Sequence, residues 1–174
     1  MRKLPDSRLL RISKATKIEL AAWIEGSNLE ATAGMPLNVL TLTVTVHRYR
    51  LALLHLAQGN KLFSGQRPAY RGSISRYYYA LYNGFRACAY IFHGGDDHEK
   101  HVVLPKYIPD DFPNSAQWQN ALKDAREMRN RADYDPYPRH QGSLKSDAIQ
   151  LRRDASVSMP VIKSYLQGKG CVLK

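Results

Sequence analysis

Residues 73–92 read SISRYYYALYNGFRACAYIF and form the most clearly periodic segment of the chain. Apolar side chains recur there at every third or fourth position, which places them on one face of an α-helix. That face consists of Ile74, Tyr77, Leu81, Phe85, Cys88 and Phe92. Ser73 is suited to cap this helix, and Gly94 with the residues after it is suited to end it. We therefore expect a long helix in the core.

The opposite side of the same helix mixes cations with aromatic rings, a combination suited to phosphates and stacked bases. It presents Arg76, Tyr79, Asn83, Arg86 and Tyr90. A helix that packs on both sides would show a similar pattern, so burial is the alternative interpretation. Gly84 lies in the middle of this helix and permits a close backbone approach, either at a helix crossing or at a dimer contact.

The segments before the core helix show weaker patterns. Residues 7–23 suit a helix, and the glycines, asparagine and proline between 26 and 36 indicate a loop. Apolar residues from 37 to about 57 follow helical spacing, and Gly59 suits the end of that helix. Residues 40–46 alternate like a strand, but the length of the whole pattern favours a helix.

Two further helices are expected after the core helix. A loop rich in charge and proline comes first, with a short helical turn near residues 101–107. A helix is expected at 115–134, because prolines follow it directly. The last helix covers about 143–167. Pro160 should kink or interrupt it, and the basic tail at 168–174 should be mobile.

Length and composition bound the class of protein. A chain of 174 residues can fold around one core, and two cysteines are too few for a disulfide scaffold. No apolar run is long enough for a membrane span or suited to a signal peptide, so we expect a cytoplasmic protein. Lysine and arginine outnumber aspartate and glutamate by 26 to 15, which favours polyanionic partners such as nucleic acid. Solvated basic faces, acidic proteins or anionic lipids would satisfy the same charge.

Arg129 occupies an unusual place in the helix expected at 115–134. It shares one face with apolar residues that include Trp118 and Leu122, so a cation points into a side otherwise suited to burial. One interpretation is an ion pair with Asp133, one turn later. The other places Arg129 in a cleft, where its guanidinium would bind a nucleotide phosphate or stabilise the charge that develops when a ribose hydroxyl attacks phosphorus.

Three short motifs resemble those of the HEPN superfamily. Residues 75–80, SRYYYA, are similar to the family's second-helix signature, and residues 98–101, HEKH, stand where members often carry a short histidine-containing loop. Residues 129–134, RNRADY, resemble the family's arginine-centred motif in the variant form that reads Arg, two residues, then Ala-Asp-Tyr. The resemblance covers residues 37–166.

The resemblance implies an all-α fold, an up-and-down bundle of four or five helices at residues 37–167. An additional N-terminal helix would belong to a basic extension at 1–36, and a basic tail would follow at 168–174. Members are usually dimeric, with the arginine motifs of two protomers facing one cleft. Many are metal-independent RNA endonucleases, and others are partners of small nucleotidyltransferases in toxin–antitoxin pairs or serve antiviral defence.

One position departs from the nuclease pattern of the family, in which a histidine follows the arginine after about four to six residues. Tyr134 and two further residues that are not histidine stand there instead. Metal-free RNA cleavage needs one group to take the proton of the ribose hydroxyl and another to protonate the leaving oxygen. Neutral imidazole suits both tasks, and tyrosine does not. His140 could fold back, or His98 or His101 could supply the imidazole, unless these are solvated loop histidines.

The candidate residues and functions follow from these patterns. The catalytic candidates are Arg129, Asn130, Tyr134 and His140, and the nucleic-acid-binding candidates are Arg76, Tyr79, Asn83, Arg86, Arg126 and Arg131. No cofactor is expected, and a metal site at the loop histidines is set aside because no further ligand completes it. We expect a homodimer that acts on RNA or nucleotides, in a toxin–antitoxin or antiviral defence setting. The alternatives are a noncatalytic partner of a nucleotidyltransferase or other protein, and a helical module that binds RNA through charge alone.

Overall fold

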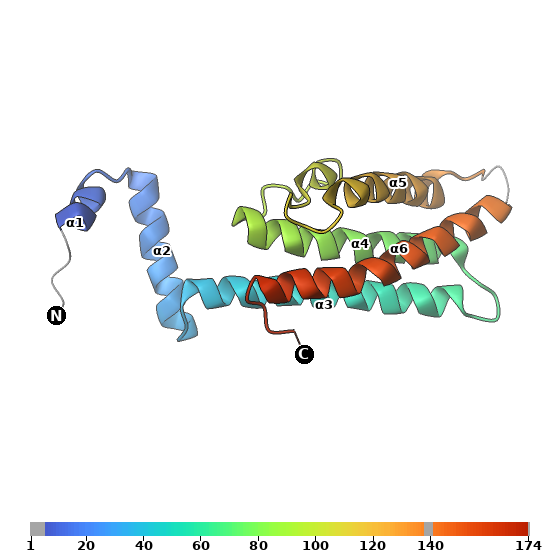
Figure 1. Ribbon diagram of the computed structural model, residues 1–174, viewed down its shortest axis with the longest axis horizontal. Helices are drawn as coiled ribbons and strands as arrows, with labels where there is room; N and C mark the ends of the chain where they lie inside the picture. The colour runs from blue at the N-terminus through green and yellow to red at the C-terminus, as the bar shows by residue number, and fades with distance from the viewer. Residues whose placement is uncertain (1–5, 138–140, 174) are drawn as a thin grey trace. The chain divides into compact units, whose positions relative to one another are not determined.

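The computed structural model describes residues 6–137 and 141–173, and every regular element in these ranges is a helix. The chain runs through α1 (Asp6–Ser13), α2 (Lys17–Ala33), α3 (Leu37–Phe63), α4 (Tyr70–His93), the short 3₁₀ helix η1 (Leu104–Tyr107), α5 (Ser115–Tyr134) and α6 (Gln141–Gly168), all labelled in Figure 1 except η1. The predicted all-α class is therefore confirmed. The chain forms two compact units, Met1–Thr41 and Leu42–Lys174, which are described separately below.

The first unit holds two helices where the sequence predicted a helix and a loop. The helix predicted at 7–23 is interrupted at residues 14–16, and the prediction of a loop at 26–36 is wrong for 26–33, because α2 continues through Gly26 to Ala33. A capping box starts α2: Oγ1 of Thr16 accepts from the N–H of Glu19 at 3.3 Å, and the Glu19 carboxylate accepts from the N–H of Thr16 at 2.8 Å. One glycine inside a helix costs only about 1 kcal/mol, so Gly26 does not stop α2. Gly34 ends it in the left-handed conformation, with φ of 64°.

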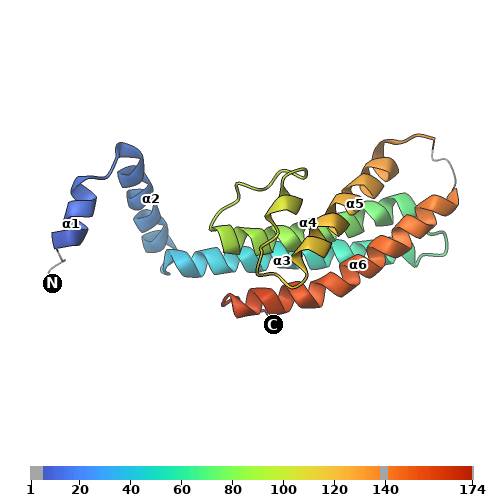
Figure 2. The ribbon, with the colours of Figure 1, turned by 45° about the horizontal axis from the view of Figure 1, so that its top comes forward.

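α4 is the central helix of the second unit. The apolar face predicted for it is confirmed as core up to Cys88, whereas Phe92 in its last turn is 39 % exposed. The opposite side of α4 is partly covered: Asn83 is buried, Arg76 is exposed, and the other three residues predicted there are half-buried. Helices α3, α5 and α6 surround it to form a bundle, as Figures 1 and 2 show.

The predicted end of α4 is confirmed, whereas its predicted start is wrong. The helix begins at Tyr70, so the prediction of Ser73 as its N-cap is wrong. Ser73 lies buried inside the first turn, and its hydroxyl donates to the carbonyl of Tyr70 at 2.9 Å. The C-terminal end is as predicted, because Gly94 has φ of 74° and its N–H donates to the carbonyl of Tyr90 at 3.0 Å.

Two glycines mark close contacts between helices. A Cβ added to Gly84 would lie 2.8 Å from Cδ1 of Ile162, so α6 crosses closely over α4 at the glycine for which a crossing was predicted. A Cβ added to Gly59 would lie 2.7 Å from the ring of Tyr77. Gly59 was predicted to end a helix, and this is wrong, because α3 continues to Phe63. Close packing against Tyr77 explains this glycine instead.

Helices α5 and α6 complete the bundle. α5 covers the predicted range, and η1 lies within the predicted turn. The predicted interruption at Pro160 is absent, since α6 runs through that residue. Pro160 is exposed to solvent, where water can bond the carbonyl that lacks its helical partner. Within the described ranges, no helix combines the length and the apolar character needed to span a membrane.

The tail after α6 packs on the bundle, so the prediction of a mobile tail is wrong for residues 169–173. Gly170, with φ of 91°, turns the chain back, and the N–H of Cys171 donates to the carbonyl of Leu166 at 3.0 Å. Cys171 and Leu173 are buried in the core cluster of the bundle. The burial of these two apolar side chains therefore fixes the tail, although its basic composition suggested a mobile segment. Cys171 is a free thiol, as is Cys88 on α4.

Candidate functional site

Arg129 lies near the C-terminal end of α5, and its guanidinium reaches across to α4. Its Nη2 donates to the hydroxyl of Tyr79 at 3.0 Å, and its Nη1 donates to Oδ1 of Asn130 at 3.2 Å. Its Nε lies 2.7 Å from Oδ2 of Asp133, an ion pair whose N–H is not aligned for a hydrogen bond. The guanidinium carbon lies 5.5 Å and 5.1 Å from the ring centroids of Tyr79 and Tyr134.

The ion pair predicted between Arg129 and Asp133 is confirmed, but it does not occupy the whole guanidinium. The Arg129 side chain keeps 17 % of its surface exposed, and its two terminal nitrogens contact neutral oxygens. Burial alone would lower the pKa of Arg129, but Tyr79, Asp133 and Tyr134 outweigh it and raise the pKa above its ordinary value. A permanently charged, partly exposed guanidinium held by aromatic rings suits the binding of an anion.

Tyr79 is the ring around which two imidazoles also gather. The ring centroid of His55 on α3 lies 5.5 Å from that of Tyr79, and the centroid of His101 lies 5.9 Å from it. We call Tyr79, Arg129, His55 and His101 the Tyr79 cluster. Its four members come from three helices and from the loop after α4, so the cluster exists only in the folded bundle.

His101 is held by two tyrosines of α4. The hydroxyl of Tyr78 lies 2.7 Å from its Nδ1, and the ring of Tyr82 stacks on the imidazole with centroids 4.2 Å apart. Burial lowers the pKa of His101, and the positive charges of Arg129, Arg86 and Arg126 lower it further. The imidazole is therefore mainly neutral at pH 7. In the tautomer whose Nδ1–H donates to the Tyr78 hydroxyl, Nε2 carries no proton and can accept one from a ligand.

His55 is a member of the cluster that the sequence analysis missed. Its Nδ1 lies 3.4 Å from Nη1 of Arg76, a long contact in which the guanidinium is the donor and Nδ1 the acceptor. That contact favours the tautomer with the proton on Nε2. Burial lowers the pKa of His55, and Arg76 lowers it further. No pattern within α3 indicated this role, because His55 meets Tyr79 only through the packing of α3 against α4.

The remaining nucleic-acid candidates differ in their partners. Arg126 lies close enough to His101 to help lower its pKa, and its charge partly offsets the burial that raises the pKa of Tyr78. The buried Nε of Arg126 has no hydrogen-bond partner among the described residues. Asn83 is buried, and its Nδ2 donates to the carbonyl of Tyr79 at 2.8 Å. Nη2 of Arg131 lies 3.0 Å from Oδ2 of Asp147, which is not a member of the Tyr79 cluster.

The remaining predicted residues are Arg86, Tyr134 and His140. Arg86 is engaged with the carboxylates of Asp96 and Glu99. Tyr134 is 69 % exposed at the end of α5, where its ring flanks Arg129. His140 lies outside the described residues. The roles of these residues, and of those in the preceding paragraph, in binding or catalysis stay predictions.

The first histidine of the HEKH motif, His98, belongs to another cluster. His98 stacks on Tyr107, with ring centroids 3.6 Å apart and an interplanar angle of 5°, and its ring also lies 4.7 Å from that of His93. The structure therefore places His101, and not His98, beside Arg129 through Tyr79. No group of three or more metal-ligating His, Cys, Asp or Glu side chains is found in the part of the chain that the structure describes.

The arrangement joins an anion-binding group to two proton-transfer groups. A phosphate oxygen would meet the guanidinium of Arg129, and the imidazoles of His55 and His101 would lie on the same tyrosine ring. No family model, no curated protein and no solved structure matches this chain.

Proposed function

We propose that this chain is a HEPN-type protein that acts on RNA as a metal-independent endoribonuclease, as a homodimer in the cytoplasm. One observation carries the proposal: Arg129, partly exposed and charged, shares the ring of Tyr79 with two imidazoles whose pKa values are lowered. The net charge of +11 favours a polyanionic substrate. The toxin–antitoxin or antiviral setting is proposed from the resemblance of the RNRADY motif at residues 129–134.

In the proposed reaction, the ribose 2′-hydroxyl attacks the adjacent phosphorus. Nε2 of His101 takes the proton from that hydroxyl, the bond from O2′ to phosphorus forms, and the bond from phosphorus to O5′ breaks. The leaving O5′ receives a proton from the second imidazole, His55, in its protonated form, which is the minor form at neutral pH because its pKa is lowered. Arg129 stabilises the negative charge that develops on the phosphoryl oxygens. The products are a 2′,3′-cyclic phosphate and a free 5′-hydroxyl, and no metal ion takes part.

The test is cleavage of a labelled single-stranded RNA and a labelled structured RNA by the purified full chain in EDTA. We expect products that end in a 2′,3′-cyclic phosphate, and no cleavage of an RNA with 2′-deoxy nucleotides. Arg129→Gln should lower the rate about 100-fold or more. Arg153→Gln on α6 removes the same charge from an exposed residue and should leave the rate within about twofold. RNA that stays intact at high protein concentration would exclude the catalytic proposal.

A noncatalytic partner subunit is the second candidate function. It is favoured by Tyr134, which stands where the active family pattern has a histidine, and by Asp133, which already offsets part of the Arg129 charge. This candidate predicts a stable complex with a nucleotidyltransferase or another protein, and no RNA cleavage. Purification from the native host followed by mass spectrometry tests it, and a chain that purifies only with copies of itself would contradict it.

Binding of RNA through charge alone is distinguished by the same variants. If the Tyr79 cluster forms no specific site, Arg129→Gln and Arg153→Gln should weaken RNA affinity equally, because each removes one positive charge. We expect the Arg129 variant to lose at least about tenfold more affinity than the Arg153 variant. Fluorescence anisotropy at several salt concentrations measures both the affinity and its salt dependence.

A further inference from the structure

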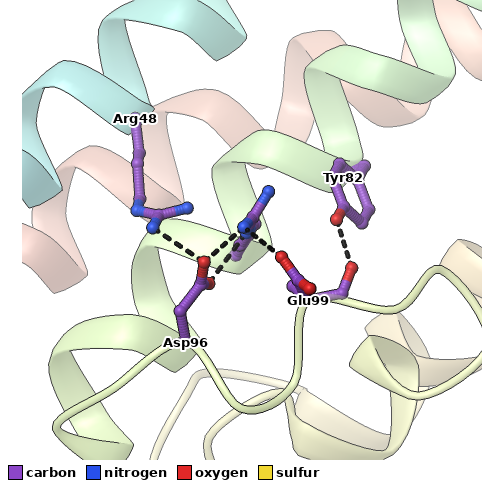
Figure 3. Close-up of polar contacts among 5 residues, drawn as sticks. Arg48, Tyr82, Asp96 and Glu99 are labelled. Atoms are coloured by element: carbon purple, nitrogen blue, oxygen red, sulfur yellow. Dashed lines mark hydrogen bonds and ion pairs between the residues drawn. The ribbon is translucent and has the colours of Figure 1, made fainter.

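The loop between α4 and η1 is fastened to the bundle by a shared carboxylate. Oδ2 of Asp96 lies 2.9 Å from Nη2 of Arg48 on α3, and Oδ1 of Asp96 accepts from Nε of Arg86 on α4 at 2.8 Å. A second nitrogen of Arg86 also contacts Asp96. Figure 3 shows the carboxylate held from two helices at once. Asp96 therefore ties the start of this loop to both α3 and α4.

A second set of contacts continues the attachment along the loop. Nη2 of Arg86 lies 3.1 Å from Oε2 of Glu99, and the hydroxyl of Tyr82 donates to the Glu99 carbonyl (Figure 3). The same Tyr82 ring carries the stacked imidazole of His101, two residues further along. The contacts of Asp96, Glu99 and His101 thus form one continuous series on the surface of α4.

The loop has little regular structure of its own to fix His101. No helix or strand covers residues 95–103, and Gly94 and Gly95 stand at its start. Within it, the N–H of Glu99 donates to the carbonyl of Asp96 at 3.2 Å, which ties the two carboxylate residues together. The placement of His101 in this loop therefore depends on side-chain contacts more than on regular backbone hydrogen bonds.

The charges of the network make Asp96 its central member. The side chains of Arg48 and Arg86 are only 21 % and 20 % exposed, so each guanidinium benefits from a nearby anion. Asp96 is the carboxylate that both arginines share, while Glu99 is 61 % exposed and contacts Arg86 alone. Hydrogen bonding to Arg86, opposed by burial and aided by Arg48, lowers the pKa of Asp96, so its carboxylate is charged at neutral pH.

We infer that Asp96 is a positioning residue, which acts through Arg48 and Arg86 to hold His101 against Tyr78 and Tyr82 within the Tyr79 cluster. The role of the held imidazole in RNA cleavage rests on the proposed function, but the positioning itself does not. Among the described residues, Asp96 bonds to Arg48 and Arg86 and not to Arg129 or Tyr79, so it would not touch the substrate. Its effect on the site is indirect, through the placement of one imidazole.

The pKa of His101 depends on this placement. Its change on removal of the Asp96 carboxylate distinguishes a role in holding the loop from a purely electrostatic role. Around the imidazole lie Arg126 and Arg129 on α5, and Arg86, Tyr78, Tyr79 and Tyr82 on α4. If the loop detaches, His101 leaves its partly buried position beside these arginines, and its pKa rises toward the ordinary value. If the loop stays in place, removing the Asp96 charge leaves Arg86 less compensated, and the pKa of His101 falls further.

The experiment compares Asp96→Asn with Asp97→Asn by NMR titration of the histidine side chains in the full chain. Asp97 is the adjacent, exposed carboxylate, so its variant removes the same charge without the two arginine contacts. We expect the His101 pKa to rise in Asp96→Asn and to stay unchanged in Asp97→Asn. An unchanged or lowered His101 pKa in folded Asp96→Asn overturns the inference.

Further variants separate this inference from the proposed function and from loss of folding. Circular dichroism verifies that each variant is folded; if Asp96→Asn is not, Arg48→Gln removes one of the two anchors and should raise the His101 pKa to a smaller extent. Asp96→Glu should retain the His101 pKa of the parent chain.

If the parent chain cleaves RNA, Asp96→Asn should lower the cleavage rate about 100-fold, while the affinity for RNA, which depends on Arg129, changes less than about threefold. A parent chain without RNA cleavage would overturn the proposed function alone, because the NMR result would still stand.

Discussion

The hydroxyl of Tyr79 accepts a hydrogen bond from Nη2 of Arg129 at 3.0 Å, although the two residues lie 50 positions apart. The bond joins α4 to α5 at the point where the ring of Tyr79 also meets His55 and His101. One side chain therefore connects an anion-binding group with two imidazoles. Changes at Tyr79 should affect both the stability of the bundle and the orientation of Arg129.

Replacement of Tyr79 by phenylalanine tests the hydroxyl separately from the ring. Tyr79→Phe keeps the aromatic contacts and removes the acceptor, so the free energy of unfolding should fall by about 1 kcal/mol. Tyr79→Ala also removes the ring and should cost about 3 kcal/mol. Urea denaturation measures both. Tyr137→Phe is the control, since Tyr137 is 85 % exposed, and it should change stability by less than about 0.5 kcal/mol. Equal stability of Tyr79→Phe and the parent would contradict the predicted role of the hydroxyl.

Gly59 and Gly26 should respond in opposite directions to alanine. In Gly59→Ala the new Cβ would lie 2.7 Å from the Tyr77 ring, so the ring must move and strain its hydroxyl contact with Asn60. We expect a net loss of about 1–3 kcal/mol in the free energy of unfolding. A Cβ on Gly26 would meet Leu37 at an ordinary 3.6 Å, so Gly26→Ala should gain helix propensity.

The measurement for the glycine pair needs two readouts. Urea denaturation reports the loss in Gly59→Ala, and far-ultraviolet circular dichroism reports any gain of helix in α2 of Gly26→Ala. A stabilised Gly59→Ala would show that the Tyr77 ring yields without cost and that the close contact between α3 and α4 is not needed.

The parts of the fold that the sequence predicted well are those governed by local rules. α5 was predicted with its observed bounds, because its apolar face is periodic and prolines follow it. The ion pair of Arg129 with Asp133 was foreseeable for the same reason, since residues four apart on a helix are neighbours. α2 was misjudged because glycine, asparagine and proline were weighted above the capping box of Thr16 and Glu19, which the sequence also contains.

The contacts that assemble the candidate site depend on tertiary packing instead. His55 and Tyr79 meet because α3 and α4 pack closely, which no spacing within one helix indicates. Arg86 was assigned to nucleic acid from its place beside aromatic rings, and the structure shows it bound to Asp96, a residue from the following loop. A cation among rings suits a phosphate or a carboxylate equally well, so the pattern alone could not tell which anion it meets.

The stability of the chain should fall as the pH drops through the range in which histidines titrate. Burial lowers the pKa of His55 and of His101 in the folded state, and neighbouring arginines lower both further. An unfolded histidine titrates near pH 6.5, so it binds a proton at a higher pH than the folded one. The unfolded state therefore gains protons first, and stability present above about pH 7 is lost as the pH falls below 6.5.

Urea denaturation at several values between about pH 5 and pH 8 measures this dependence. The double variant His55→Gln/His101→Asn should show a flatter dependence than the parent over this range. His47→Gln, which removes an exposed histidine of α3, is the control and should follow the parent curve. A double variant with the same pH dependence as the parent would show that these two imidazoles are not the groups responsible.

The packed tail offers a sharp comparison between adjacent residues. Leu173 is 8 % exposed, whereas Val172, its neighbour, is 76 % exposed. Leu173→Ala should lower the free energy of unfolding by about 2–3 kcal/mol, because it removes buried methyl groups and leaves a cavity. Val172→Ala should change it by less than about 0.5 kcal/mol. Urea denaturation gives both values, and hydrogen exchange at the N–H of Cys171 should quicken only in Leu173→Ala. Equal and small effects would mean that the tail is not held in the core, because burial is the only property that distinguishes these two aliphatic side chains strongly.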